Sequence, residues 1–195
     1  MDWMKDFFVW DSKDEGNTCV LSVIQKVKKT GRLSLGIELL ADWPSDAYFS
    51  MDPEFPRDMG LADNLKNFNS VAIISGPLMQ FLEEKGVTNT EFLPVGIINH
   101  KGKPVVGKYF IVNPIHPQDC LDVKTSEPEY YSISPTKVSN VQRLVLDPKR
   151  IAPEVAIFRV KNFGAPIVIR AELANEIVAA GFTGISWKNP LQYKG

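Results

Sequence analysis

The chain alternates between short apolar runs and polar punctuation along most of its length. Runs rich in β-branched or aromatic residues and bounded by Gly, Pro, Asp or Asn predict short β-strands. In the first part of the chain these predicted strands cover residues 7–10, 19–24, 33–39, 48–51 and 71–74. Farther along they cover residues 91–95, 108–112, 144–146, 156–160, 166–169 and 184–187. Clear helical spacing is confined to two segments, so strands should dominate the fold.

Two of the early strands are expected to pair with each other. Residues 19–24 are apolar and β-branched, and residues 33–39 alternate between apolar and small or polar side chains. The basic stretch between them contains Gly31, which suits the tip of a hairpin. We therefore predict an antiparallel hairpin over residues 19–39.

The clearest helix lies between the predicted strands 71–74 and 91–95. Ser75 stands at the N-cap position, and Pro77 falls in the first turn, where its missing N–H loses no helical hydrogen bond. Gly86 can adopt the left-handed conformation that ends a helix. One face of this helix carries an apolar stripe at the spacing i, i+3 and i+4: Leu78, Phe81 and Leu82.

The same strand–helix–strand plan recurs near the end of the sequence. A helix over residues 172–180 follows strand 166–169, ends at Gly181 and precedes strand 184–187. Equivalent positions of the two units match in pairs: Leu78 with Leu173, Leu82 with Ile177, Gly86 with Gly181 and Thr88 with Thr183. Two interpretations are open: a weak internal repeat, or the similarity that any two amphipathic helices ending at glycine would show.

Together these elements predict an α+β fold dominated by strands, with antiparallel or mixed sheets and two short strand–helix–strand units. No linker-like composition divides the chain, so we predict a single domain over residues 1–195. This domain should have two lobes, a β-rich N-terminal part over residues 1–63 and a second part over residues 64–195.

Composition narrows the classes of partner. The chain has 195 residues, of which 44% are hydrophobic, and this is enough for a sizeable core. Its 22 basic and 23 acidic residues give a net charge of -1, without the cationic surplus typical of proteins that bind nucleic acid. No apolar run approaches the roughly 20 residues that a membrane-spanning helix requires. We therefore expect neither a nucleic acid nor a membrane as partner.

The beginning of the sequence argues against secretion. Residues 1–6 carry acids where a signal peptide carries cations, and Asp6 and Asp11 interrupt the apolar stretch that follows. Cys19 and Cys120 are two cysteines far apart, which do not make a disulfide framework. We expect a cytoplasmic protein with reduced thiols.

Motifs for catalysis or cofactor binding are scarce. The sequence contains neither a glycine-rich phosphate loop nor a nucleophile elbow, and no catalytic residue, cofactor or metal is expected. One stretch departs from this pattern, because His116 and Cys120 lie close in sequence to Asp119 and Asp122. These are metal-ligand types, and a cysteine with a histidine can form a nucleophile and base. The other interpretation makes Cys120 a small core residue, as free cysteines usually are.

The loop between residues 42 and 58 combines acids, aromatic residues and prolines. Acids in such loops commonly serve turn chemistry and solvation. A protein-binding patch is the second interpretation, since aromatic anchors with a charged rim are typical of interfaces. A general acid and base pair is the third. If the loop binds a partner, the contact residues would be Asp42, Trp43, Asp46, Tyr48, Asp52, Glu54, Phe55 and Asp58.

Two stretches of the sequence resemble a family of bacterial immunity proteins found beside polymorphic toxins, many of whose members are described only as domains of unknown function. The first spans residues 71–127 and contains the first strand–helix–strand unit and a strand that ends in Asn113-Pro114. The second spans residues 157–185 and contains most of the second unit. The matching positions that should determine the fold are Gly86, Gly181, Phe92, Phe110, Phe158 and Ile185.

The resemblance implies a protein that binds a cognate toxin or effector domain encoded nearby and blocks it by occlusion, without catalytic residues of its own. An acidic surface would speed its association with a basic toxin. One alternative is a small hydrolase or transferase that uses carboxylates or Cys120 and His116. Another is a scaffold or regulatory domain within a larger assembly. The sequence leaves the identity of the toxin and the oligomeric state open.

Overall fold

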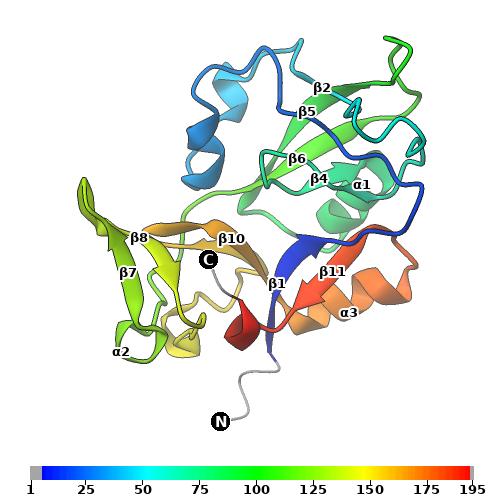
Figure 1. Cartoon of the computed structure of the whole chain (residues 1–195). Coiled ribbons are helices and arrows are strands. Elements are labelled where there is room, and N and C mark those ends of the chain that lie inside the picture. The colour runs from blue at the N-terminus through cyan, green and yellow to red at the C-terminus, as the bar shows by residue number, and fades with distance from the viewer. Residues whose placement is uncertain (1–5, 194–195) are drawn as a thin grey trace.

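The computed structural model describes residues 6–193 and consists of two larger β-sheets, a separate hairpin and few helices. Strands account for 36% of the chain and helices for 19%, which confirms the prediction of a strand-dominated α+β fold. Figure 1 shows the five-stranded sheet above the four-stranded sheet, with the hairpin standing out from the body. Residues 1–5, which include Asp2, one of the acids that argued against a signal peptide, lie outside the described residues.

The four-stranded sheet joins the beginning of the chain to its end. Its order is β11 (Ile185–Lys188), β1 (Phe7–Ser12), β10 (Phe163–Arg170) and β9 (Ile157–Val160), and all its pairs are antiparallel. Strand β1 is therefore central, flanked on both sides by strands that come much later in the sequence. The division into lobes at residue 63 stays a prediction.

The five-stranded sheet is mixed. Its order is β2 (Tyr48–Ser50), β5 (Thr90–Ile98), β6 (Tyr109–Pro114), β4 (Ile73–Ser75) and β3 (Asn64–Leu65). Strands β2 and β5 are parallel, and the other neighbours are antiparallel. Strand β2 lies at one edge, which places the loops before and after it at the periphery of the molecule.

Both predicted strand–helix–strand units form. Helix α1 (Gly76–Glu84) begins after β4, and the Ser75 side chain accepts a hydrogen bond from the Leu78 N–H, as an N-cap does. Helix α3 (Ala171–Ala179) begins directly after β10. Gly86 and Gly181 follow these helices with φ values of 75° and 81°, in the region where a side chain is disfavoured.

The apolar faces of α1 and α3 meet in one core cluster that also takes residues from both sheets. Leu78 and Leu82 of α1 and Leu173 and Ile177 of α3 are buried in it. Each such side chain contributes about 1.5–3 kcal/mol when it is fully removed from water. Phe158 is buried in a neighbouring cluster, and three other expected fold determinants pack half-buried against the helix cluster: Phe92, Phe110 and Ile185.

The predicted hairpin over residues 19–39 is wrong. Residues 19–24 form isolated bridges instead, in which Leu21 pairs with Met51 on one side and Asn67 on the other. The 3-10 helix η2 (Thr30–Ser34) covers the predicted tip at Gly31 and the first two residues of the second predicted strand. The physical reason is competition from distant partners, because the buried Arg159 side chain donates a hydrogen bond to the Leu33 carbonyl over 2.9 Å.

A second difference concerns residues 121–146. No helix or strand is predicted between residues 112 and 144, but the structure has a short helix α2 (Val123–Ser126) and a hairpin of β7 (Pro128–Tyr131) and β8 (Ser134–Val141) there. Residues 144–146 form no strand, and Leu146 makes one isolated bridge with Leu121. The remaining 3-10 helices are η3 (Leu40–Asp42), η4 (Pro148–Arg150) and η5 (Pro190–Gln192).

The helices between residues 6 and 193 do not include one with both the length and the hydropathy that crossing a bilayer would require.

Candidate protein-interaction surface

The loop proposed from sequence as a contact surface wraps around the edge strand β2. Asp42, Trp43 and Asp46 precede this strand, whereas Glu54 and Phe55 follow it. The structure therefore divides seven of the eight predicted residues into two groups at opposite ends of one short strand. Tyr48 lies half-buried in the strand itself.

The loop is held firmly to the body of the protein. The Trp43 indole N–H donates to the Pro94 carbonyl over 2.8 Å, which attaches the first group to β5. After the strand, the Asp52 backbone N–H donates to the Val20 carbonyl over 2.8 Å. The Asp52 side chain is buried and accepts a hydrogen bond from the Glu54 N–H over 2.8 Å. Asp52 thus serves turn chemistry inside the loop.

The outward-facing part of this surface is mixed in charge. Asp42, Asp46, Glu54 and Phe55 are exposed, and Asp58 is half-buried. Asp42 and Trp43 share a crevice of about 300 Å³ with four cationic residues of the segment before η3: Lys26, Lys28, Lys29 and Arg32. The crevice at the Asp42 end is therefore lined by more cationic than acidic side chains, while the end near Glu54 carries its acid beside exposed apolar side chains such as Phe55 and Met59.

The structure separates the groups of the His116–Asp122 stretch. His116 is exposed and adopts a left-handed backbone conformation with φ of 59°. Cys120 is fully buried in a hydrophobic cluster, and this burial raises its pKa to about 12. Nucleophilic cysteines act as thiolates, so this environment does not favour a cysteine nucleophile. Asp122 instead caps α2, where its carboxylate accepts from the Thr125 N–H and hydroxyl.

Within residues 6–193, no three His, Cys, Asp or Glu side chains gather closely enough to hold a metal ion.

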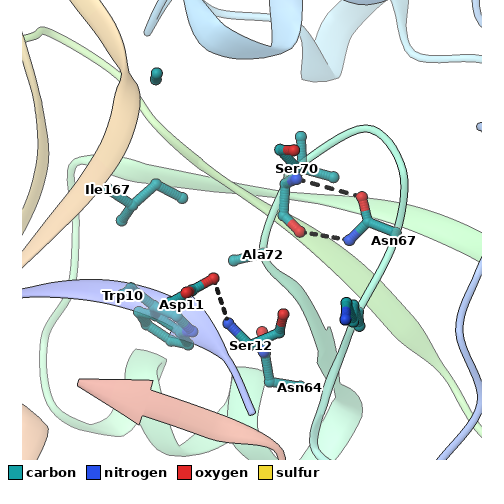
Figure 2. Close-up of a pocket in the computed structure, with 11 residues that line it drawn as sticks. Trp10, Asp11, Ser12, Asn64, Asn67, Ser70, Ala72 and Ile167 are labelled. Atoms are coloured by element: carbon teal, nitrogen blue, oxygen red, sulfur yellow. Dashed lines mark hydrogen bonds between the residues drawn. The ribbon is translucent and has the colours of Figure 1, made fainter. Parts of the chain in front are cut away.

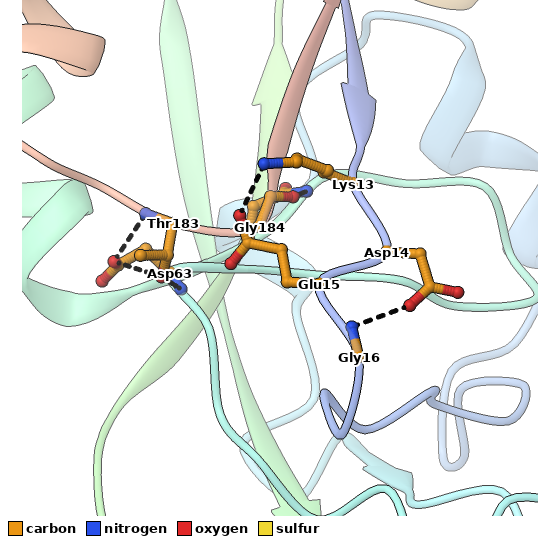
Figure 3. Close-up of polar contacts among 8 residues, drawn as sticks. Lys13, Asp14, Glu15, Gly16, Asp63, Thr183 and Gly184 are labelled. Atoms are coloured by element: carbon orange, nitrogen blue, oxygen red, sulfur yellow. Dashed lines mark hydrogen bonds and ion pairs between the residues drawn. The ribbon is translucent and has the colours of Figure 1, made fainter.

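A polar junction that the sequence analysis missed fastens the two larger sheets together (Figure 3). The Asp63 carboxylate accepts hydrogen bonds from the Ser75 hydroxyl over 2.7 Å and from the Thr183 N–H and hydroxyl over 3.0 and 2.9 Å. Beside it, the Asn64 side chain donates to the Gly184 carbonyl over 2.9 Å. A β-carbon at Gly184 would lie 2.1 Å from the Asn64 carbonyl oxygen, so this close approach requires glycine.

Next to this junction, a crevice of about 210 Å³ opens between β1 and the segment after β3 (Figure 2). Trp10 and Ile167 line it from the four-stranded sheet, and Asn64, Asn67 and Ala72 line it from the other side. The Asn67 side chain stabilises its own loop, because its amide donates to the Val71 carbonyl over 2.6 Å. The Trp10 indole nitrogen and the Asn64 side-chain oxygen are buried and have no hydrogen-bond partner among the described residues.

The crevice and the junction could not be recognised from local sequence. Their residues come from parts of the chain that are far apart in sequence. Ser75 is recognisable as the N-cap of α1, but no local pattern pairs it with Asp63 or Thr183. Asp63 and Asn64 fall in a segment that composition marks only as loop.

Comparison with known protein families gives a match over most of the chain. The sequence model of an immunity protein family, Imm11, matches residues 11–190. This region includes the 42–58 loop, the polar junction and both strand–helix–strand units. The curated proteins searched contain no match to the chain.

Proposed function

Because the chain belongs to the Imm11 immunity protein family, we propose that it binds a cognate bacterial toxin and neutralises it by covering the toxin's active site. The family match over residues 11–190 carries this proposal. The burial of Cys120 supports it further, since the alternative of a hydrolase or transferase with a Cys120 nucleophile would require an accessible thiolate.

We place the first contact with the toxin on the 42–58 loop. Its exposed acids and Phe55 combine charge with an apolar anchor, a composition typical of interfaces. The hydrogen bonds that fix Trp43 and Asp52 support this assignment, because a loop that is already ordered loses little conformational entropy on binding. Asp52 and Tyr48 would support the surface from within rather than touch the partner.

The proposal includes a location and a stoichiometry. The protein would act in the cytoplasm, in a one-to-one complex with a toxin domain encoded nearby, and without nucleic acid or membrane as partner. Its near-neutral charge of -1 supports a protein partner over a polyanion.

Co-expression tests the function directly. The probe is the C-terminal domain of the large secreted protein encoded beside this chain. We expect the two proteins to purify as a stable complex and co-expression to restore growth. A neighbour that is toxic but neither binds nor is neutralised would contradict the proposed function.

Neutralising the exposed acids of the loop should slow association. We expect the triple variant Asp42→Asn, Asp46→Asn and Glu54→Gln to lower the association rate about 3- to 10-fold at low salt, because steering of a basic partner is weakened. The measurement is binding kinetics at two ionic strengths, since screening at high salt should remove most of the difference.

The matched control removes the same charge elsewhere. Its three acids are exposed and lie on α1 and before β9: Glu83, Glu84 and Glu154, each changed to Gln. Equal association rates for the two triple variants would remove the 42–58 loop from the interface.

A further inference from the structure

The crevice beside Trp10 is the first of three that follow one another between the sheets. A second crevice of about 320 Å³ shares Ser70, Val71 and Ala165 with it. A third of about 360 Å³ shares Gly31, Ser34 and Ala165 with the second and reaches the β7–β8 hairpin. Because Ala165 lines all three, they form one elongated depression, which we call the inter-sheet groove.

An interruption in β10 opens this groove. Phe163 pairs with Val160 and Ile167 pairs with Arg159, so the register shifts over the residues between them. Strand β1 reaches only as far as Ile167, which pairs with Trp10. Residues 164–166 thus lie beyond the ladder with β1 and within the interruption of the ladder with β9, and Ala165 is exposed. β-Bulges often lie next to functional sites, where they change the direction in which side chains point.

Three buried polar atoms of groove-lining residues have no partner among residues 6–193. They are the Trp10 indole N–H, the Asn64 side-chain oxygen and the Arg159 Nε, on residues that are 6%, 1% and 2% exposed. Buried polar groups in proteins are nearly always hydrogen-bonded, so each of these atoms needs an explanation. Together they offer two donors and one acceptor.

In Arg159 only part of the guanidinium group is hydrogen-bonded. Its terminal nitrogens donate to the carbonyls of Gly164, Ala165 and Leu33 over 2.5, 3.3 and 2.9 Å. These contacts hold η2 against β10 and shape the groove wall, while the buried Nε has no hydrogen-bond partner among the described residues. None of the ion pairs found in the described part of the chain involves this guanidinium.

Exposed apolar side chains border the groove. Phe68 lies at the second crevice, and Leu35 and Tyr131 lie at the third. Large apolar side chains around a centre with buried polar groups are the composition of a binding hot spot. A single water needs only about 10–15 Å³, so even the smallest crevice is far larger than one water would require.

We infer that the inter-sheet groove binds an extended segment of the toxin, whose backbone pairs with the unpartnered groups of Trp10, Asn64 and Arg159 and whose side chains contact Phe68, Leu35 and Tyr131. An extended backbone presents carbonyls and N–H groups alternately, which matches a set of donors and an acceptor along an elongated site. This inference rests on the proposed function and adds a second contact to the 42–58 loop.

Filling the groove tests the inference. Ala165→Trp places a large side chain at the point where the three crevices meet, and the exposure of Ala165 leaves the core untouched. We expect the dissociation constant for the co-purified toxin domain to rise at least about tenfold. Phe68→Ala, which introduces no bulk, should weaken binding in the same direction. The matched control is Val106→Trp, at a residue that is 96% exposed and lies in the β5–β6 connection.

The outcomes separate the two proposals. Tight binding by the unchanged protein and the Val106→Trp variant, with weak binding by the folded groove variants, would establish the groove contact. Unchanged binding by Ala165→Trp and Phe68→Ala would overturn the groove contact and leave the immunity function standing. Absence of binding by the unchanged protein would overturn both. Thermal unfolding of every variant confirms that binding is compared between folded proteins.

Discussion

At the scale of single residues, burial decides what the titratable side chains can do. Arg159 lies in β9 between Phe158 and Val160, all fully buried, and this burial lowers its pKa to about 10. It remains a cation at neutral pH, but it donates its hydrogen bonds to backbone carbonyls rather than to an acid. The two cysteines show the opposite shift, because burial opposes the thiolate and raises the pKa of Cys19 to about 11 and that of Cys120 to about 12.

The raised thiol pKa values predict a pH dependence of stability. The unfolded chain loses these protons near pH 9, whereas the folded chain keeps them, so the stabilisation is complete below about pH 9 and declines as the pH rises toward the folded values. Cys120→Ala should flatten this decline by up to about 1.4 kcal/mol per pH unit. The measurement is denaturant unfolding between about pH 8 and pH 10.

The comparison uses slopes because the substitution also removes packing. Loss of the buried sulfur lowers stability by a similar amount at every pH. Parallel curves for the variant and the unchanged protein would show that Cys120 does not titrate differently in the two states.

At the scale of elements, local signals predicted what local interactions determine. Ser75, Pro77 and Gly86 each act within one helical turn of α1, so the boundaries of this unit could be read from sequence. Residues 19–24 have a strand pattern of equal quality, but Leu21 finds its partners in Met51 and Asn67. Sequence periodicity does not show which segment a strand pairs with, because competing pairings differ in long-range packing rather than in local propensity.

The two proposed binding surfaces also differ in whether local sequence reveals them. Composition could suggest the 42–58 loop as a contact surface because its acids and aromatic residues are contiguous, although it could not show that Asp52 is buried. The inter-sheet groove escaped notice because its wall combines β1, η2 and β10, which are distant in sequence.

Two glycines of the second strand–helix–strand unit offer a matched pair of substitutions. Gly181 and Gly184 have φ values of 81° and 76°, but a β-carbon at Gly181 meets no described atom within 4 Å, whereas one at Gly184 meets the Asn64 carbonyl oxygen at 2.1 Å. Gly181→Ala should cost about 1–2 kcal/mol in free energy of unfolding from backbone strain. Gly184→Ala should cost at least about 3 kcal/mol, because the junction must also move.

Chemical denaturation of both variants measures this difference. A similar loss for both would mean that the loops before β3 and β11 separate without resistance. The structure argues against this, since the Asp63 carboxylate and the Asn64 side chain also connect these loops.

At the scale of the whole molecule, the two sheets depend on each other. Strand β1 fills the centre of a sheet whose other members come from the last part of the chain, and the clusters around α1 and α3 draw on both sheets. The groove and the 42–58 loop both rely on this arrangement, because their walls are fixed by contacts between segments far apart in sequence.

The predicted lobes can be tested by separation. A fragment of residues 64–195 keeps β9, β10 and β11 but lacks β1, so the pairings of Phe7 with Arg170 and of Trp10 with Trp187 are lost. We expect this fragment to lack a cooperative unfolding transition, which circular dichroism during heating measures. A cooperative transition near that of the full chain would establish residues 64–195 as an independent domain.

The central position of β1 also sets when protection can begin. A ribosome adds about 5–20 residues per second, so β1 emerges roughly 8–35 s before β10 and β11 become available to flank it. During that interval the four-stranded sheet cannot close, and the groove has no wall on that side. Each newly made molecule would therefore become able to restrain a toxin only at the end of its synthesis, and a cell would need a standing reserve of finished copies before the toxin arrives.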